Sequence, residues 1–169
     1  MDGILYYENM AFNDLRGNFA KLYQNGRETP GLEFHLQEIF ISKSKKDVIR
    51  GFHLQMGSSA NHRLISVVNG SVLDVLLDLR PESPTFMRFH SREMNAANPH
   101  ILIVPPGVAH AFLALEECQM VYVSDKVFDP ELDAGVNPLQ CGYDWPVVEP
   151  IISARDLQLP TSQEWQDTH

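Results

Sequence analysis

Short runs of β-branched and other apolar residues, separated by turn residues, fill the middle of this chain. Residues 64–68, 71–79 and 100–104 are such runs, and segments rich in Gly, Pro or Asn follow them. Strands that recur about every 8 to 12 residues with turns between them are typical of an antiparallel sandwich or barrel. We expect further strands at 34–42, 86–92, 111–115 and 119–124.

The turn signals predict how some of these strands pair. Asn69-Gly70 is a common two-residue hairpin turn and predicts that its flanking strands are partners. The acidic pair Glu116-Glu117 predicts a second hairpin. Short helical turns are expected near 153–157 and at the C-terminus. No repeat or linker divides residues 1–169, so we expect one all-β domain.

Composition narrows the class of partner. The chain has 169 residues and a formal charge of −9, which argues against a nucleic-acid surface. Cys118 and Cys141 form no CxxC pair, and a reduced compartment is the simplest interpretation. We see neither a signal peptide nor an apolar run long enough to cross a membrane. A cytoplasmic protein is therefore expected.

Seven histidines raise the question of a metal site. Metal sites in small β-barrels use His residues on neighbouring strands, often as H-x-H. Here Leu54 and Gln55 follow His53, and Arg63, which would repel a dication, follows His62. We predict neither a metal nor another cofactor.

A different set of polar residues predicts proton transfer. Strand alternation puts His53 and Gln55 on one face with Gly51. Arg63, His110 and Tyr122 belong to other strands, and inward positions of a closed barrel converge on one cavity. A base near neutral pKa facing a C–H, with a cation facing the adjacent carbonyl oxygen, suits removal of an α-proton.

Each of these residues also has a purely structural explanation. His53 is as easily a hydrogen-bonded core residue, and Tyr122 a packing residue with a tied hydroxyl. Arg63 alone is more often part of a surface ion pair. Asp74 and Asp78 lie on one face of a strand and can simply pair with basic neighbours.

The order of several motifs resembles the dTDP-4-dehydrorhamnose 3,5-epimerase family. They include Arg50-Gly51-Phe52-His53-Leu54-Gln55, Val104-Pro105-Pro106-Gly107-Val108-Ala109-His110 and Gly142-Tyr143-Asp144-Trp145-Pro146. The resemblance runs from about residue 12 to residue 160. It implies a cupin-type jelly-roll β-barrel that works without a metal. It also implies deoxysugar biosynthesis, including dTDP-rhamnose and lipopolysaccharide pathways.

The resemblance implies a catalytic role for four residues. His53 matches the base, and Asp156 the carboxylate that pairs with it. Tyr122 matches the general acid on the other face of the sugar. Arg63 stands where the family usually has Lys, beside the enolate oxygen, and brings a planar fork in place of an ammonium.

The same resemblance implies the substrate contacts. His110 matches a second pocket histidine, with Asp74 as its carboxylate partner. Arg16 and Arg50 match arginines that hold the diphosphate and nucleotide, Gln37 a residue near the nucleotide, and Arg155 a further basic contact. Family members are dimers that exchange N-terminal strands, so a homodimer is expected in which Arg16 serves the neighbouring subunit.

Three positions depart from the family pattern. Lys21 stands where Glu is common, and Ile39 where Asn is usual, both in the nucleotide region. Phe128 replaces the second tyrosine of a Tyr-Tyr pair close to the sugar. The first two leave CDP and GDP open as nucleotides, and the lost hydroxyl favours epimerisation at one carbon.

The expected function is therefore epimerisation of a nucleotide-diphospho-4-keto-6-deoxysugar at C3, C5 or both. A 3,4-ketoisomerase of the same fold is the alternative enzyme. A cupin-like module that binds a sugar nucleotide without turning it over is the non-enzymatic alternative.

Overall fold

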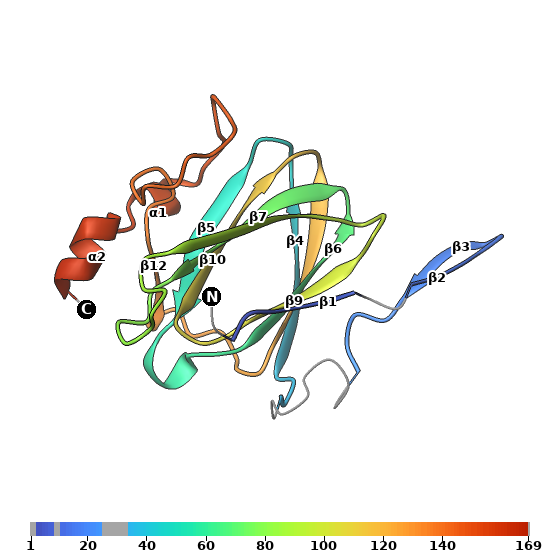
Figure 1. The fold of residues 1–169 in the computed structure, drawn as a ribbon, viewed down its shortest axis with the longest axis horizontal. Coiled ribbons are helices and arrows are strands. Elements are labelled where there is room, and N and C mark those ends of the chain that lie inside the picture. Colours follow the sequence, from blue (N-terminus) through green and yellow to red (C-terminus); the bar gives the residue numbers. More distant parts are fainter. Residues whose placement is uncertain (1–2, 9–10, 25–33, 169) are drawn as a thin grey trace.

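Two five-stranded antiparallel sheets face each other and enclose the core (Figure 1). The computed structural model describes residues 3–8, 11–24 and 34–168. Sheet I holds, in spatial order, β1 (Leu5–Glu8), β9 (His100–Val104), β6 (Arg63–Asn69), β11 (Cys118–Ser124) and β4 (Glu38–Ser44). Sheet II holds β12 (Asp133–Gly135), β5 (Ile49–Gln55), β10 (Val108–Ala114), β7 (Ser71–Asp78) and β8 (Phe89–Asn95). The predicted all-β architecture is confirmed.

Smaller elements lie outside the two sheets. The strands β2 (Ala11–Asp14) and β3 (Gly17–Ala20) form a hairpin that projects away from the barrel (Figure 1). A 3₁₀ turn spans Gly57–Ser59. The predicted helical turns are present as α1 (Ala154–Leu157) and α2 (Ser162–Thr168).

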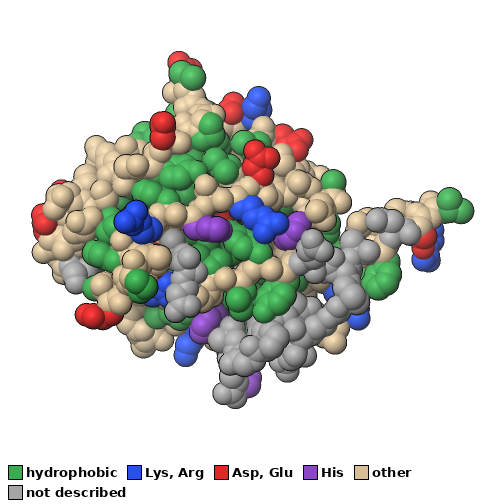
Figure 2. All heavy atoms as spheres, in the orientation of Figure 1, with side chains coloured by type: hydrophobic (Ala, Val, Ile, Leu, Met, Phe, Trp, Pro, Cys, Tyr) green, Lys and Arg blue, Asp and Glu red, His purple; other side chains and the backbone are tan. Residues whose placement is uncertain are grey.

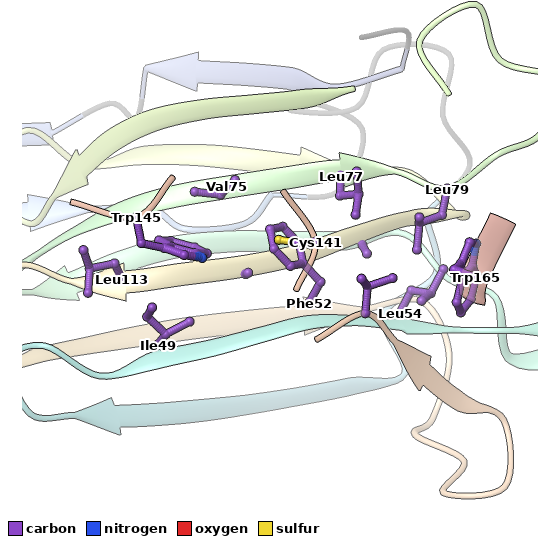
Figure 3. Close-up of a cluster of buried hydrophobic side chains, with 13 residues drawn as sticks. Ile49, Phe52, Leu54, Val75, Leu77, Leu79, Leu113, Cys141, Trp145 and Trp165 are labelled. Carbon is purple, nitrogen blue, oxygen red and sulfur yellow. The ribbon is translucent and has the colours of Figure 1, made fainter. Parts of the chain in front are cut away.

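Alternating side chains build a core on each face of sheet II. On β10, Val108, His110, Phe112 and Ala114 point between the sheets, whereas Ala109, Ala111 and Leu113 point outward. Every residue of β10 is buried, because the chain after β12 covers the outer face. Figure 3 shows this cover, with Trp145 at one end of the apolar cluster and Trp165 at the other. The C-terminal segment is thus part of the core.

Both predicted hairpins are wrong, although the chain does turn where expected. Asn69-Gly70 joins β6 in sheet I to β7 in sheet II, and Glu116-Glu117 joins β10 in sheet II to β11 in sheet I. The two turns pack together, since a Cβ on Gly70 would lie against the carbonyl oxygen of Glu117. A jelly roll carries the chain between facing sheets at such points, so neighbours in sequence are not partners.

Element boundaries were predicted to within a few residues. Residues 100–104 match β9 fully, whereas β8 begins at Phe89 because residues 81–87 form turns. Asp78 holds these turns, accepting hydrogen bonds from Arg80, Ser83 and Thr85. Asp78 therefore has a structural role.

A bulge in β5 decides which of its side chains face the interior. His110 of β10 pairs with His53, and Phe112 pairs with Arg50, so three steps along β5 match two along β10. Arg50 and His53 consequently line the same cavity, whereas simple alternation would put them on opposite faces. Gly51 sits in the bulge with φ +111°, and a Cβ there would lie 2.7 Å from Cα of Ala111.

We expect Gly51→Ala to destabilise the fold by about 2 to 5 kcal/mol, because it adds steric overlap to an unfavourable φ. Gly142→Ala is the matched control: its φ is +89°, but nothing lies within 4 Å of the added Cβ. The control should cost only about 1 to 2 kcal/mol. Urea unfolding followed by circular dichroism measures both, and equal losses would contradict the role given to close strand contact.

Candidate active site

A cavity of about 330 Å³ opens between the two sheets. Figure 2 shows histidine and basic side chains gathered near the centre of one face, with acidic side chains toward its rim. The cavity brings together eight of the residues predicted from sequence: Arg50, His53, Arg63, His110, Tyr122, Phe128, Arg155 and Asp156. The predicted convergence of inward positions on one cavity is therefore confirmed.

The partly buried His53 and the buried Asp156 form a pair at the wall made by sheet II. Nε2 of His53 lies 2.8 Å from Oδ1 of Asp156, whose side chain is only 4% exposed. The backbone N–H of Gly51 donates to the other carboxylate oxygen at 3.3 Å. Among the described residues Nδ1 of His53 has no hydrogen-bond partner, so this nitrogen remains available to a ligand.

The short helix α1 fixes the carboxylate of Asp156. Ser153 caps the helix by accepting a hydrogen bond from the backbone N–H of Asp156. Burial raises the pKa of Asp156, but the hydrogen bond and charge of His53 outweigh it and leave the pKa below its usual value. The carboxylate is thus ionised behind the imidazole, where it sets the tautomer and stabilises the imidazolium.

A second histidine–carboxylate pair lies deeper between the sheets. Nε2 of His110 is 2.6 Å from Oδ2 of Asp74, and the two side chains are 5% and 0% exposed. His110 lies beside His53 because their strands pair at that position. Of the aspartates predicted on one face of β7, Asp74 thus serves the cavity and Asp78 pairs with Arg80.

Arg63 enters the cavity from sheet I. Its Nη2 donates to the carbonyl oxygens of His53, at 3.1 Å, and Val108, at 3.3 Å. Nε is buried and has no partner among the described residues. Burial lowers the pKa of Arg63 to about 10, so the guanidinium stays charged at neutral pH. It is a fixed cation with unused donor capacity, which suits a developing oxyanion.

Tyr122 also comes from sheet I and faces the histidines of sheet II. Its ring meets His110 edge-on, with centroids 6.0 Å apart. The hydroxyl accepts a long hydrogen bond from Ser42 Oγ, at 3.5 Å. Burial raises the pKa of this phenol, so it holds its proton at neutral pH. An acid and a base are therefore carried by opposite walls of the cavity.

The remaining predicted cavity residues are held by neighbours at its rim. Arg50 donates from Nε to Ser44 Oγ at 2.9 Å, and Arg155 is ion-paired with Asp133. Phe128 is 50% exposed, and its backbone N–H donates to Glu38 at 3.1 Å. The rim of the cavity therefore carries two cationic side chains and one apolar ring.

The residues predicted at the start of β4 and just before it lie on the face away from the cavity. Gln37 and Ile39 are exposed and do not line the cavity, whereas Glu38, Phe40 and Ser42 do. Because side chains alternate along a strand, a shift of one residue in the prediction assigns every side chain to the opposite face. Phe40 and Glu38 were missed because β4 is an edge strand whose outer face also carries exposed apolar residues, so its pattern is ambiguous.

Arg16 and Lys21 also lie away from the cavity of their own chain. Arg16 is on the projecting hairpin, where it is exposed and paired with Asp14 at 2.6 Å. Lys21 is exposed just after β3. Arg16, Lys21 and Gln37 therefore have no contact with this site within one described chain.

Two other features of the described residues bear on ligands and location. No three His, Cys, Asp or Glu side chains among them lie close enough together to hold a metal ion. Within the described ranges, no helix has the length and apolar character needed to span a bilayer.

Comparison with known proteins decides the family. The profile of the family "dTDP-4-dehydrorhamnose 3,5-epimerase" matches residues 1–164. The chain belongs to this family. The enzyme of that name from Salmonella typhimurium is 34% identical over 163 residues, which cover 93% of this chain and 89% of the relative. The resemblance predicted from the sequence motifs is therefore confirmed.

Solved structures of dTDP-4-dehydrorhamnose 3,5-epimerase relatives show the same fold. The enzyme from Sulfolobus tokodaii superposes with a TM-score of 0.92 at 33% identity, covering 97% of this chain and 93% of its own. ChmJ, a 3'-monoepimerase from Streptomyces bikiniensis in complex with dTDP-quinovose, gives 0.92 at 28% identity, with coverages of 98% and 87%. The predicted cupin-type jelly roll and the predicted enzyme class, an isomerase acting as an epimerase, are confirmed.

The depressed pKa of Asp156 links this site to stability. The ionised carboxylate stabilises the fold fully above the unfolded pKa of about 3.9, and that contribution is lost as pH falls through the lower folded pKa. We expect Asp156→Asn to cost about 1 to 3 kcal/mol at pH 7 and less at pH 3. Urea unfolding at both pH values measures this.

Asp144→Asn is the control, because Asp144 is exposed and has no hydrogen bond or ion pair among the described residues. It should change stability by under about 0.5 kcal/mol at either pH. A cost for Asp156→Asn that stays the same from pH 7 to pH 3 would rule out the linkage.

Proposed function

We propose that this protein epimerises a dTDP-linked 4-keto-6-deoxysugar by proton transfer between its own side chains. One observation carries the proposal: His53 of sheet II with its partner Asp156 of α1, and Tyr122 and Arg63 of sheet I, line a single cavity. Inversion at a carbon needs a base on one side and an acid on the other, and the two walls supply them.

The reaction begins with His53. Nδ1 takes the proton from the carbon next to the sugar carbonyl, and the C–H electron pair moves into the carbonyl to form an enolate. Asp156, 2.8 Å behind Nε2, stabilises the resulting imidazolium. The low pKa of Asp156 keeps its negative charge in place while the imidazole gains a proton.

Arg63 and Tyr122 complete the step. The buried guanidinium of Arg63 stabilises the enolate oxygen, for which its unpartnered Nε is a ready donor. The Tyr122 phenol then gives its proton to the carbon from the face opposite His53; solvent returns a proton to the phenolate and takes one from the His53 imidazolium. His110, held by Asp74, supports the sugar, while Arg50 and Arg155 meet the diphosphate and nucleotide.

Phe128 supports a second candidate, an epimerase that inverts one carbon only. This ring lines the cavity and offers no hydroxyl to the sugar. Relatives at about the same identity include a dTDP-4-dehydrorhamnose 3-epimerase from Streptomyces niveus, 31% identical over 148 residues. Both specificities therefore occur among similar chains.

Deuterium exchange tests the proposal and separates the candidates. In D2O with dTDP-4-dehydro-6-deoxyglucose, we expect deuterium at C3, C5 or both, read by NMR. Label at both carbons supports the 3,5-epimerase, and label at one supports the single-carbon enzyme. Parallel CDP, GDP and UDP sugars test the nucleotide. Absence of label with every sugar nucleotide, or a product whose keto group has moved to C3, would overturn the proposal.

His53→Ala should abolish exchange, and Asp156→Asn should slow it about 10²- to 10⁴-fold, because the imidazolium loses its counter-charge. Circular dichroism and thermal melting check that both variants are folded. Exchange that persists in folded His53→Ala would remove His53 from the role of base.

We further propose that the enzyme works in the cytoplasm as a homodimer, supplying deoxysugar for polymers such as lipopolysaccharide. The projecting β2–β3 hairpin supports a dimer, because its apolar side chains Phe12, Leu15 and Phe19 are 57%, 108% and 59% exposed. A second subunit would cover them and receive Arg16 near its own cavity.

Light scattering of the purified protein tests the dimer. We expect about twice the chain mass of 19.2 kDa, and Leu15→Asp should shift the mass toward that of one chain. A wild-type mass near 19.2 kDa at micromolar concentration would exclude the exchanged hairpin as a stable contact.

A further inference from the structure

Phe40 stacks on the ring of the proposed acid, Tyr122. It lies on β4 directly opposite Tyr122 of β11 in the strand pairing. The two rings are stacked, with centroids 4.7 Å apart and planes inclined by 5°. Phe40 therefore covers one face of the phenol ring.

Little else fixes the Tyr122 hydroxyl. Its hydrogen bond from Ser42 Oγ is 3.5 Å long, and its contact with the sulfur of Met120 is 3.6 Å. Bonds of this length orient a group weakly. The edge-on His110 ring, with centroids 6.0 Å away, is the other aromatic contact among the described residues. The position of the hydroxyl oxygen thus depends mainly on how the Tyr122 ring is packed, and Phe40 holds one face of that ring.

Core packing does not account for Phe40. Its side chain is 43% exposed and lines the cavity, so it is not a core residue. Its neighbours on the outer face of β4, Ile39 and Ile41, are even more exposed. An aromatic ring at the wall of a polar cavity, flat against a proton donor, is better explained by what it does to that donor.

We infer that Phe40 is a positioning residue that aims the Tyr122 hydroxyl at the face of the sugar opposite His53. The inference rests on the proposed function. In the step that it serves, the Tyr122 O–H bond breaks, a C–H bond forms from the enolate electron pair, and the phenolate regains a proton from solvent. Proton removal and return by His53 on its own face needs no help from Phe40.

Because only inversion needs Tyr122, the ratio of exchange to inversion distinguishes a poorly aimed phenol from general damage to the site. In D2O, return of a deuteron by His53 labels recovered substrate with its configuration retained. Delivery by Tyr122 instead gives labelled product with inverted configuration. A poorly aimed phenol lowers inversion while retained-configuration exchange continues, so the ratio of exchange to inversion rises.

The experiment compares wild type, Phe40→Leu and Phe40→Tyr with dTDP-4-dehydro-6-deoxyglucose in D2O. We expect Phe40→Leu to lower inversion about 10- to 100-fold and to raise the exchange-to-inversion ratio at least about fivefold. Phe40→Tyr keeps a flat ring against Tyr122 and should restore the ratio to within about twofold of wild type. Ile41→Leu, on the outer face of the same strand, should leave the ratio unchanged.

The outcomes separate this inference from the proposed function. If wild type shows neither exchange nor inversion, the proposed function fails, and the role of Phe40 fails with it. If wild type is active and Phe40→Leu lowers exchange and inversion equally, the proposed function stands and the positioning role is overturned. A raised ratio in Phe40→Tyr equal to that in Phe40→Leu would also overturn it.

Discussion

The close approach of β5 to β10 is the constraint on which the site depends. Gly51 has no Cβ, so the backbone of β5 can bulge against Ala111 of β10. The bulge shifts the inward and outward alternation of β5 by one residue, so that Arg50 and His53 line one cavity. The Gly51 backbone N–H also binds the carboxylate that pairs with His53. One residue without a side chain therefore sets strand spacing, side-chain direction and the position of Asp156.

The two sheets that form the walls of the cavity carry different kinds of charged and polar groups. The two cavity histidines of sheet II each have a buried carboxylate behind them, Asp156 for His53 and Asp74 for His110. Sheet I contributes a buried guanidinium and a phenol whose pKa is raised. Because the base and the acid are built into different sheets, the space between them is set by the separation of the sheets. Proton transfer across that space depends on the barrel as a whole.

Local sequence signals predicted the strands well, because apolar β-branched runs and Gly/Pro turns are properties of short segments. They could not predict partners: Asn69-Gly70 reverses the chain, but which sheet receives β7 depends on contacts far along the chain. On edge strand β4, exposed Ile39 and Ile41 hid the true inward face, and Phe40 was missed. Strand alternation grouped His53, Arg63 and Tyr122, but Asp156 was placed only through the resemblance in motif order, since it is far from His53 in sequence and no spacing rule joins the two.

The carboxylate behind His53 comes from α1, near the end of the chain and after every strand of both sheets. A ribosome therefore makes the whole barrel before it makes Asp156. The same C-terminal segment carries Trp145 and Trp165, which seal the outer face of sheet II. A nascent chain, or one clipped by a protease before α1, has His53 without its carboxylate and sheet II without Trp165. The helices α1 and α2 bring Asp156 to His53 and Trp165 to the core one after the other. A chain that ends before α1 therefore has no oriented base.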